Sequence, residues 1–164
     1  MGLFEIFLVL AAFLCSLVAG FLFAFAIVVM PGIKGLGNRE YIRAFQVIDG
    51  VIQNNQPLFI VVWIGSIMAL IIAAVFSIGR LDAIGYGVLA LATLIYLLGV
   101  QLPTFAINIP LNNMLQSMDV DTMDGSAQEA ARNIFEVRWN RWNVIRTVLS
   151  CLVSALLMVL MFRY

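Results

Sequence analysis

Residues 6–33 read IFLVLAAFLCSLVAGFLFAFAIVVMPGI and carry no charged side chain. The hydrocarbon core of a bilayer is about 30 Å thick, and about 20 apolar residues in a helix cross it. The stretch is long enough to span a membrane, and its length together with the acidic Glu5 distinguishes it from a cleavable signal peptide. It therefore predicts a transmembrane helix near the start of the chain.

Three more uncharged stretches follow: residues 51–79, 83–118 and 147–162. We predict an all-α membrane protein in which four transmembrane helices form one domain over residues 1–164. The expected spans are about residues 4–30, 57–79, 83–103 and 143–162. Each span carries small residues at regular spacing, such as Gly65, Ala69 and Ala73, which let helices approach closely in lipid. These faces predict either a compact four-helix bundle or contacts between copies of the chain.

The composition excludes several classes of protein. Hydrophobic residues make up 63% of the chain and charged residues 11%, whereas soluble domains are about 45–50% apolar and about 25% charged. Nine basic residues balance nine acidic ones, which argues against nucleic-acid binding. The chain has no histidine, so histidine-ligated metals and histidine-dependent triads are excluded. We expect neither a metal nor another cofactor.

Positive charge is concentrated in two long segments, residues 31–56 and 104–142. Basic residues favour the cytoplasmic side of a membrane, so both segments are expected in the cytoplasm and both termini outside. We expect a plasma-membrane protein, in the inner membrane of a bacterium, with membrane lipids as its surroundings. A second copy of the chain or a subunit of a larger membrane complex is a further possible partner.

Residues 38–53 have the periodicity of an amphipathic helix, with Tyr41, Phe45 and Ile52 on its apolar face. We expect this helix in the cytoplasmic interface or packed on the end of the bundle. Asp49 is the exception, because it falls on the apolar arc. Two interpretations stay open: an ion pair with an arginine of the other long segment, or a partly desolvated carboxylate that acts as a base.

The last helix is expected to begin near residue 127, because the sequence SAQE at 126–129 has the pattern of a capping box that starts with Ser126. The aspartates at 119, 121 and 124 predict a solvated acidic turn before it. The helix then continues into the fourth span.

Arg146 lies inside the last apolar stretch, where a charged group needs a partner within the bundle. We expect it to face away from lipid. The expected partners are carbonyl groups freed near Pro103 or Pro110, the Asn112 amide and Asp49.

All four prolines, at positions 31, 57, 103 and 110, fall at the predicted cytoplasmic ends of the spans. A proline has no N–H, and inside a helix it also frees the carbonyl four residues back. In a membrane such groups need partners or water. Amide side chains at the same ends can supply donors and acceptors: Asn54, Asn108, Asn112 and Asn143. They form either a network that satisfies interrupted helix ends or the polar floor of a pocket for a flat lipophilic ligand.

Four groups of residues carry a resemblance to a known family. They are GFLFAF at 20–25 with MPG at 30–32, FQVID at 45–49 with IQN at 52–54, PLNN at 110–113, and W-x-x-x-N-x-x-R-T at 139–147. Together they resemble the anthrone oxygenase-like family of small four-helix membrane proteins, long labelled a domain of unknown function, over about residues 5–160. Some fungal members are assigned to the oxidation of anthrones to anthraquinones in polyketide pathways, whereas most bacterial members have no assigned role.

The activity implied by this resemblance needs few groups. An anthrone has an acidic CH between two aromatic rings, and removal of that proton gives a carbanion that can react with O2 without a metal. The site then needs a base, donors for the phenolate-like oxygen and an apolar slot, and we assign the base to Asp49. The candidates for substrate binding are Asn112, Asn143 and Arg146 as donors, Phe45 and Trp139 as stacking rings, and Asn54 and Asn108 as further amides.

The alternative hypothesis is a non-catalytic membrane scaffold or an accessory subunit of a larger membrane complex. A small transporter is disfavoured, because the spans hold too few polar residues to line a path through the membrane.

Overall fold

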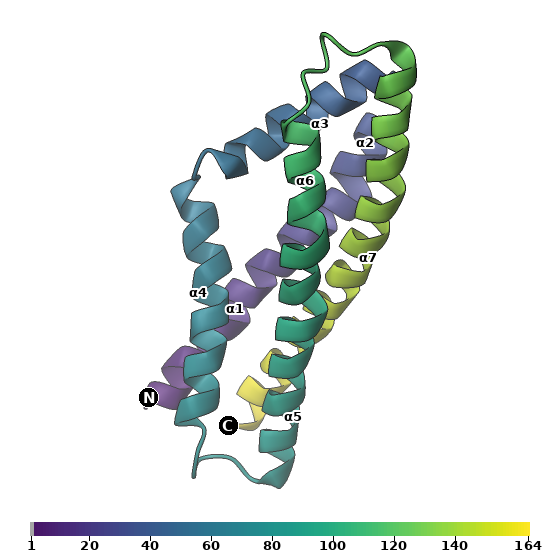
Figure 1. Cartoon of the computed structure of the whole chain (residues 1–164). Helices are drawn as coiled ribbons and strands as arrows, with labels where there is room; N and C mark the ends of the chain where they lie inside the picture. The colour runs from purple at the N-terminus through teal and green to yellow at the C-terminus, as the bar shows by residue number, and fades with distance from the viewer. Residues whose placement is uncertain (1) are drawn as a thin grey trace.

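A computed structural model describes residues 2–164 as helices and short connections, with no strand in that part of the chain. Figure 1 shows long helical rods that run side by side, with one oblique helix across their upper end. The elements are α1 (Leu3–Ala24), η1 (Phe25–Val29), α2 (Met30–Lys34), α3 (Asn38–Gln53), α4 (Pro57–Phe76), α5 (Ala83–Leu94), η2 (Ile95–Gln101), η3 (Thr104–Asn108), α6 (Ile109–Gln116) and α7 (Gly125–Arg163). The η elements are π-helical turns inside longer helices, so α1–α2 and α5–α6 are each one continuous rod.

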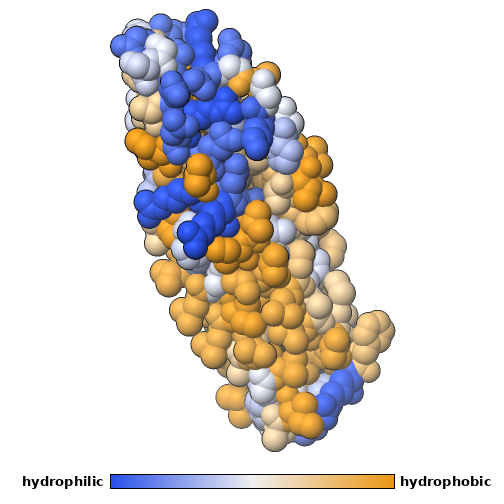
Figure 2. All heavy atoms as spheres, turned by 90° about the vertical axis from the view of Figure 1, so that its right-hand side faces the viewer, coloured by the Kyte–Doolittle hydropathy of each residue, from blue (hydrophilic) through white to orange (hydrophobic). Residues whose placement is uncertain are grey.

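Four of these rods are long and apolar enough to cross a membrane: Leu3–Lys34, Pro57–Phe76, Ala83–Gln116 and Gly125–Arg163. Apart from the turn that follows α4, they contain the four predicted spans, which confirms the all-α transmembrane fold. In Figure 2 hydrophobic side chains cover the lower and middle part of the molecule, and hydrophilic ones gather at the upper end. We therefore describe the chain as an integral membrane protein.

Two rods are longer than a bilayer requires. The α5–α6 rod has 34 residues and α7 has 39, which correspond to about 51 Å and about 58 Å at 1.5 Å per residue. A hydrocarbon core of about 30 Å cannot contain either of them. Their excess lies at the end opposite to both termini (Figure 1). There α3, α6, the 117–124 connection and the first turns of α7 form a polar part that we call the head.

The helix over residues 83–116 continues through Pro103 and Pro110, so the expected interruption of the helix at these prolines is wrong. Each proline lacks an N–H, and the π-helical turns η2 and η3 redirect the neighbouring hydrogen bonds to the fifth residue. The Thr104 hydroxyl also donates to the carbonyl of Val100 at 2.7 Å. These substitute bonds matter because lipid offers a freed carbonyl no partner.

Helix α3 spans residues 38–53, as the periodicity predicted, and its apolar face packs on the outer half of α7. Tyr41, Ile42 and Phe45 are buried, and the Phe45 ring lies 4.5 Å from the Phe135 ring, centre to centre. The head thus has an apolar core of its own, separate from that of the spans. Of the two predicted positions for this helix, the structure has the one on the end of the bundle.

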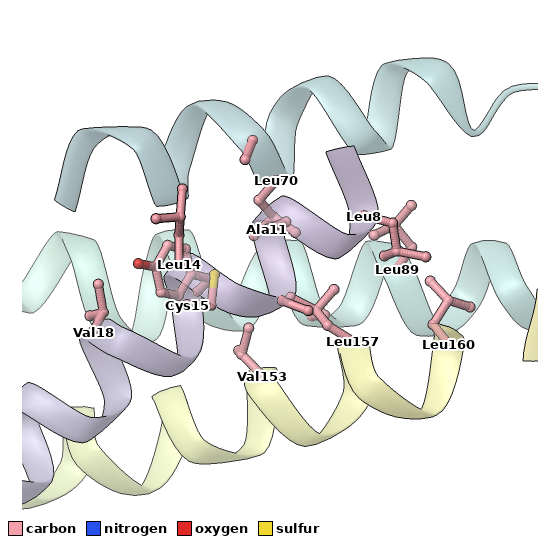
Figure 3. Close-up of a cluster of buried hydrophobic side chains, with 14 of the residues drawn as sticks. Leu8, Ala11, Leu14, Cys15, Val18, Leu70, Leu89, Val153, Leu157 and Leu160 are labelled. Atoms are coloured by element: carbon pink, nitrogen blue, oxygen red, sulfur yellow. The ribbon is translucent and has the colours of Figure 1, made fainter. Parts of the chain in front are cut away.

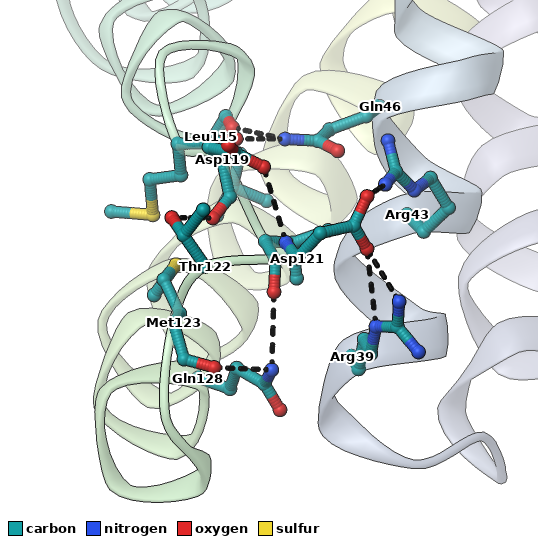
Figure 4. Close-up of polar contacts among 11 residues, drawn as sticks. Arg39, Arg43, Gln46, Leu115, Asp119, Asp121, Thr122, Met123 and Gln128 are labelled. Carbon is teal, nitrogen blue, oxygen red and sulfur yellow. Dashed lines mark hydrogen bonds and ion pairs between the residues drawn. The ribbon is translucent and has the colours of Figure 1, made fainter.

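The acidic turn before α7 is exposed to solvent, as predicted, and one of its aspartates also pairs with α3. Asp121 accepts a hydrogen bond from Arg39 at 2.6 Å and forms a second ion pair with Arg43 (Figure 4). Hydrogen bonds from these guanidinium groups lower the pKa of the Asp121 carboxyl. The pairs therefore stabilise the docked α3 at neutral pH and are lost as the pH falls through that lowered pKa.

The start of α7 also differs from the prediction. Its N-cap is Asp124, whose carboxylate accepts a hydrogen bond from the backbone N–H of Ala127 at 2.8 Å. Ser126, the expected cap, instead donates its hydroxyl to Asp124. The longer aspartate side chain precedes a glycine and reaches the free N–H groups first, so the helix begins at Gly125.

The membrane part is built around α1, which packs against α4 on one side and α7 on the other. Small side chains on α1 allow this approach: Ala11 and Cys15 are fully buried, among larger residues such as Leu70 and Leu157 (Figure 3). Close contact of this kind replaces the hydrophobic effect as the source of stability between helices in lipid.

A larger side chain at this contact should separate the helices. We expect Ala11→Leu to lower the free energy of unfolding by about 1–3 kcal/mol, because overpacking forces backbone shifts in a dense core. Thermal unfolding in detergent measures the effect. Ala90→Leu, the same change at an exposed position of α5, is the control and should have no effect. Equal melting temperatures for the two variants would contradict the packing described.

Candidate functional site

A cavity of about 260 Å³ lies where the spans meet the head. Its wall contains residues from α1, η1, α3, α4, η3, α6 and α7. The aromatic members are Phe21, Phe25, Phe45, Phe59, Trp63, Phe105 and Trp139, and the polar members are Asp49, Thr104, Asn108, Asn112, Asn143 and Arg146. Five aliphatic residues complete it: Leu22, Ile52, Ile60, Ile64 and Ile109.

The aromatic side chains pack against one another around the cavity. The Trp139 ring lies 5.6 Å from Phe45 and 5.7 Å from Phe25, and Phe21 lies 5.2 Å from Phe59, all between ring centres. These separations are typical of edge-on and tilted aromatic pairs. The rings therefore fix one another and present a rigid apolar surface suited to a flat ligand.

Asp49 is 3% exposed and is held by amide groups. Its Oδ1 accepts from Asn112 Nδ2 at 2.7 Å, and its Oδ2 accepts from Gln53 at 2.9 Å and Gln116 at 3.1 Å. Among residues 2–164, no arginine forms an ion pair with it, so the ion-pair interpretation is wrong. Oδ1 has a single donor, although a carboxylate oxygen accepts two.

Arginines of both long segments bind groups other than Asp49, including Arg132 of the segment in which its partner was expected. Arg39 and Arg43 bind Asp121. Arg132 donates to Glu136 at 2.7 Å, and it also bonds the backbone carbonyls of residues 34 and 36. It thereby satisfies carbonyl groups left free where α2 ends.

Asn112 is oriented by its neighbour on α7. The indole N–H of Trp139 can only donate, and it donates to Asn112 Oδ1 at 2.7 Å. The Asn112 amide N–H₂ must then point the other way, toward the Asp49 carboxylate. One side chain thus links α3, α6 and α7 along the polar side of the cavity.

Arg146 is 3% exposed and lies within the bundle, as predicted. Its predicted partners are wrong: the guanidinium donates to the Thr104 hydroxyl at 2.8 Å and to Asn143 Oδ1 at 3.1 Å. Within the described chain no carboxylate pairs with it, and its Nε has no partner. A buried cation with only neutral partners is costly, which makes this position unusual for a purely structural arginine.

The other predicted amides differ in their surroundings. Asn143 donates to the carbonyl of Leu22 at 3.1 Å, which ties α7 to α1. Asn108 donates to the carbonyl of Trp139 at 3.3 Å, whereas its buried Oδ1 has no partner in residues 2–164. Asn54 is exposed at the end of α3, outside the cavity wall.

Several residues of the cavity have no distinctive sequence signal. Thr104 and the aromatic residues Phe21, Phe25, Phe59, Trp63 and Phe105 were not among the candidates. An aromatic residue in an apolar span has the same pattern whether it faces lipid, core or cavity. Thr104 had one available signal, because it directly follows a proline inside a predicted span.

The sequence model of the family described as "Anthrone oxygenase" matches residues 57–156. The chain belongs to this family. No curated protein and no solved structure matches the chain. In this member of the anthrone oxygenase family, the matched residues extend from α4 into α7 and include Asn112, Trp139 and Arg146. Phe45 and Asp49 lie on α3, outside the matched part, and the match assigns no role to any single residue, so the roles of all the site residues remain predictions.

The buried Arg146 and the half-buried Arg132 should respond differently to the same change. We expect Arg146→Met to alter the free energy of unfolding by less than about 1 kcal/mol, because it removes an unpaired buried charge along with two hydrogen bonds. Arg132→Met, the matched variant in the head, should cost about 1.5–3 kcal/mol, because carbonyls and a carboxylate lose a charged donor. Thermal unfolding in detergent measures both. A larger loss for Arg146→Met than for Arg132→Met would contradict this description.

Proposed function

We propose that this anthrone oxygenase family member binds a flat lipophilic aromatic in the cavity and oxidises it with O2, with Asp49 as the base. One observation carries the proposal: the Asp49 carboxylate and the Arg146 guanidinium line the same aromatic cavity without pairing to each other. A base and a cation kept apart can act on two different atoms of one ligand.

The cavity supports an aromatic ligand. Its volume of about 260 Å³ is just below the usual range for small-molecule sites, about 300–1,000 Å³, and suits a small rigid molecule. Two buried polar atoms support the same idea, because Arg146 Nε is a donor and Asn108 Oδ1 an acceptor without partners in the described chain. Unsatisfied buried groups cost about 1–3 kcal/mol each, and a ligand oxygen or hydroxyl can remove that cost.

The chemistry balances with O2 as the only co-substrate. Asp49 takes a proton from the methylene carbon of an anthrone, and the negative charge moves onto the carbonyl oxygen. The carbanion transfers electrons to O2 and forms a C–O bond, which gives a hydroperoxide after a proton is returned. Loss of the second proton from the same carbon breaks the O–O bond. A second carbonyl then forms, and water leaves.

Arg146 is the group suited to the charged oxygen. A donor aimed at a developing oxyanion in a water-poor site commonly contributes about 10²–10³-fold to the rate. Thr104 and Asn143 hold two nitrogens of the guanidinium, and the buried Nε has no partner among residues 2–164. Asn112 is a positioning residue, because it orients the Asp49 carboxylate and bonds Trp139.

A non-catalytic role as a membrane scaffold or accessory subunit is the second candidate. The three amide donors on Asp49 favour it, because they stabilise a carboxylate that simply joins α3 to α6. The open cavity favours ligand binding instead, because a purely structural junction is normally filled by side chains.

The variant Asp49→Asn separates the two candidates. Its amide oxygen can accept from Asn112, and its N–H₂ can face Gln53, whose own amide can turn to accept. Gln116 loses its bond to residue 49 but keeps its bond to the Gln46 carbonyl, so we expect the fold to persist. Protein-dependent oxidation of anthrone should fall by about 10²–10⁴-fold, the usual contribution of a general base. Oxygen consumption and the quinone absorbance in reconstituted membranes measure this rate.

The control is Asp82→Asn, the same change at the N-cap of α5 near the termini. It should leave the rate unchanged, because asparagine also caps helices well. Wild-type protein that does not accelerate anthrone oxidation, or Asp49→Asn that is as active as wild type, would contradict the proposed function.

A further inference from the structure

The cavity is open on one side, between α4 and η3–α6. Four of its lining residues are exposed, by 37% to 53%: Ile60, Ile64, Phe105 and Ile109. All four are apolar, and they come from only two rods. In Figure 1, α4 and the α5–α6 rod start together at the lower hairpin and diverge toward the head. The opening lies at this divergence.

The other residues that line the cavity are buried or half-buried. Helices α1 and α7 cover its back with buried residues such as Leu22 and Asn143. Toward the head, α3 covers it with Phe45 and Asp49, which are both buried. A water-side path would have to pass α3, which Gln46 fastens to the end of α6 through the carbonyl of Leu115 at 2.7 Å (Figure 4).

We propose that the space between α4 and η3–α6 is a portal through which the ligand enters the cavity directly from the lipid. Both rims belong to rods that cross the membrane, and their exposed residues are all apolar, so we place the opening against acyl chains at the head end of the hydrocarbon layer. A lipophilic aromatic concentrates in that phase, and the apolar rim offers it a path without desolvating any polar group. The polar groups lie deeper, on α3, η3, α6 and α7, where they meet the ligand after entry.

This inference rests on ligand binding in the proposed function but not on the oxidation. Phe105 is the rim residue with the largest side chain, and it is 53% exposed. Leu102 lies on the same rod, is 55% exposed and does not line the cavity. The pair is therefore a matched test of the portal, because both truncations remove lipid-facing bulk from one helix.

The experiment follows anthracene, which has the flat shape but no acidic CH, in nanodiscs that hold the full chain and the probe together. Energy transfer from Trp63 and Trp139 reports binding, in a Trp142→Phe background. Relaxation after a temperature jump gives the rate of exchange between lipid and cavity. We expect Phe105→Ala to raise this rate about tenfold, as a barrier lower by about 1.36 kcal/mol would do, and Leu102→Ala to match wild type.

A third variant tests the alternative route. Asp121→Asn removes the ion pairs that hold α3, and it should leave the exchange rate unchanged. Faster exchange in Asp121→Asn with no change in Phe105→Ala would overturn the portal in favour of entry beneath α3. Equal rates for Phe105→Ala and Leu102→Ala would also overturn it. Absence of energy transfer at equilibrium in wild type would instead contradict the binding of a flat aromatic in the cavity, and the portal with it.

Discussion

A row of hydrogen bonds from Asp49 through Asn112 to Trp139 joins α3, α6 and α7 above the apolar bundle. Because the indole N–H can only donate, the direction of the whole row is fixed. It places a carboxylate beside the cavity and holds α3 across the end of the cavity that faces the head. Without it, α3 would keep its apolar contacts, the hydrogen bonds that link Gln46 to the end of α6 and its surface ion pairs, of which the exposed ion pairs contribute little to stability.

The second organising feature is the cost of polar groups in lipid. Such groups are found where they can satisfy one another, and here most of them gather in one layer between the spans and the head. Arg146 departs from this rule, since Thr104 and Asn143 are neutral and its Nε stays without a partner. We interpret this unsatisfied N–H donor of a buried cation as the feature that gives the site its preference for an oxygen-bearing aromatic. The negative charge on such an oxygen can be stabilised by the guanidinium.

The fold could be predicted from sequence because uncharged apolar runs of 16 to 36 residues have few alternatives to membrane-spanning helices. Helix α3 could be predicted because Asp49 alone breaks its amphipathic pattern. The partners of Asp49 could not be predicted from sequence. Gln53 is four residues away on the same helix, but Gln116 and Asn112 come from α6, and nothing in the sequence states which face of α6 meets α3. On charge alone an arginine of the 104–142 segment was the expected partner, but Arg132 pairs with Glu136, and Arg138 and Arg141 are exposed.

The central claim is that the cavity stabilises the ionised form of an acidic aromatic between Asp49 and Arg146. The absorption spectrum of anthrone bound to the protein under nitrogen tests it most directly, because without O2 the anion accumulates and absorbs at longer wavelength than the neutral ketone. The account predicts the long-wavelength band in wild type at neutral pH and its loss in both Asp49→Asn and Arg146→Met. A bound ligand that keeps the spectrum of the neutral ketone in wild type would contradict it.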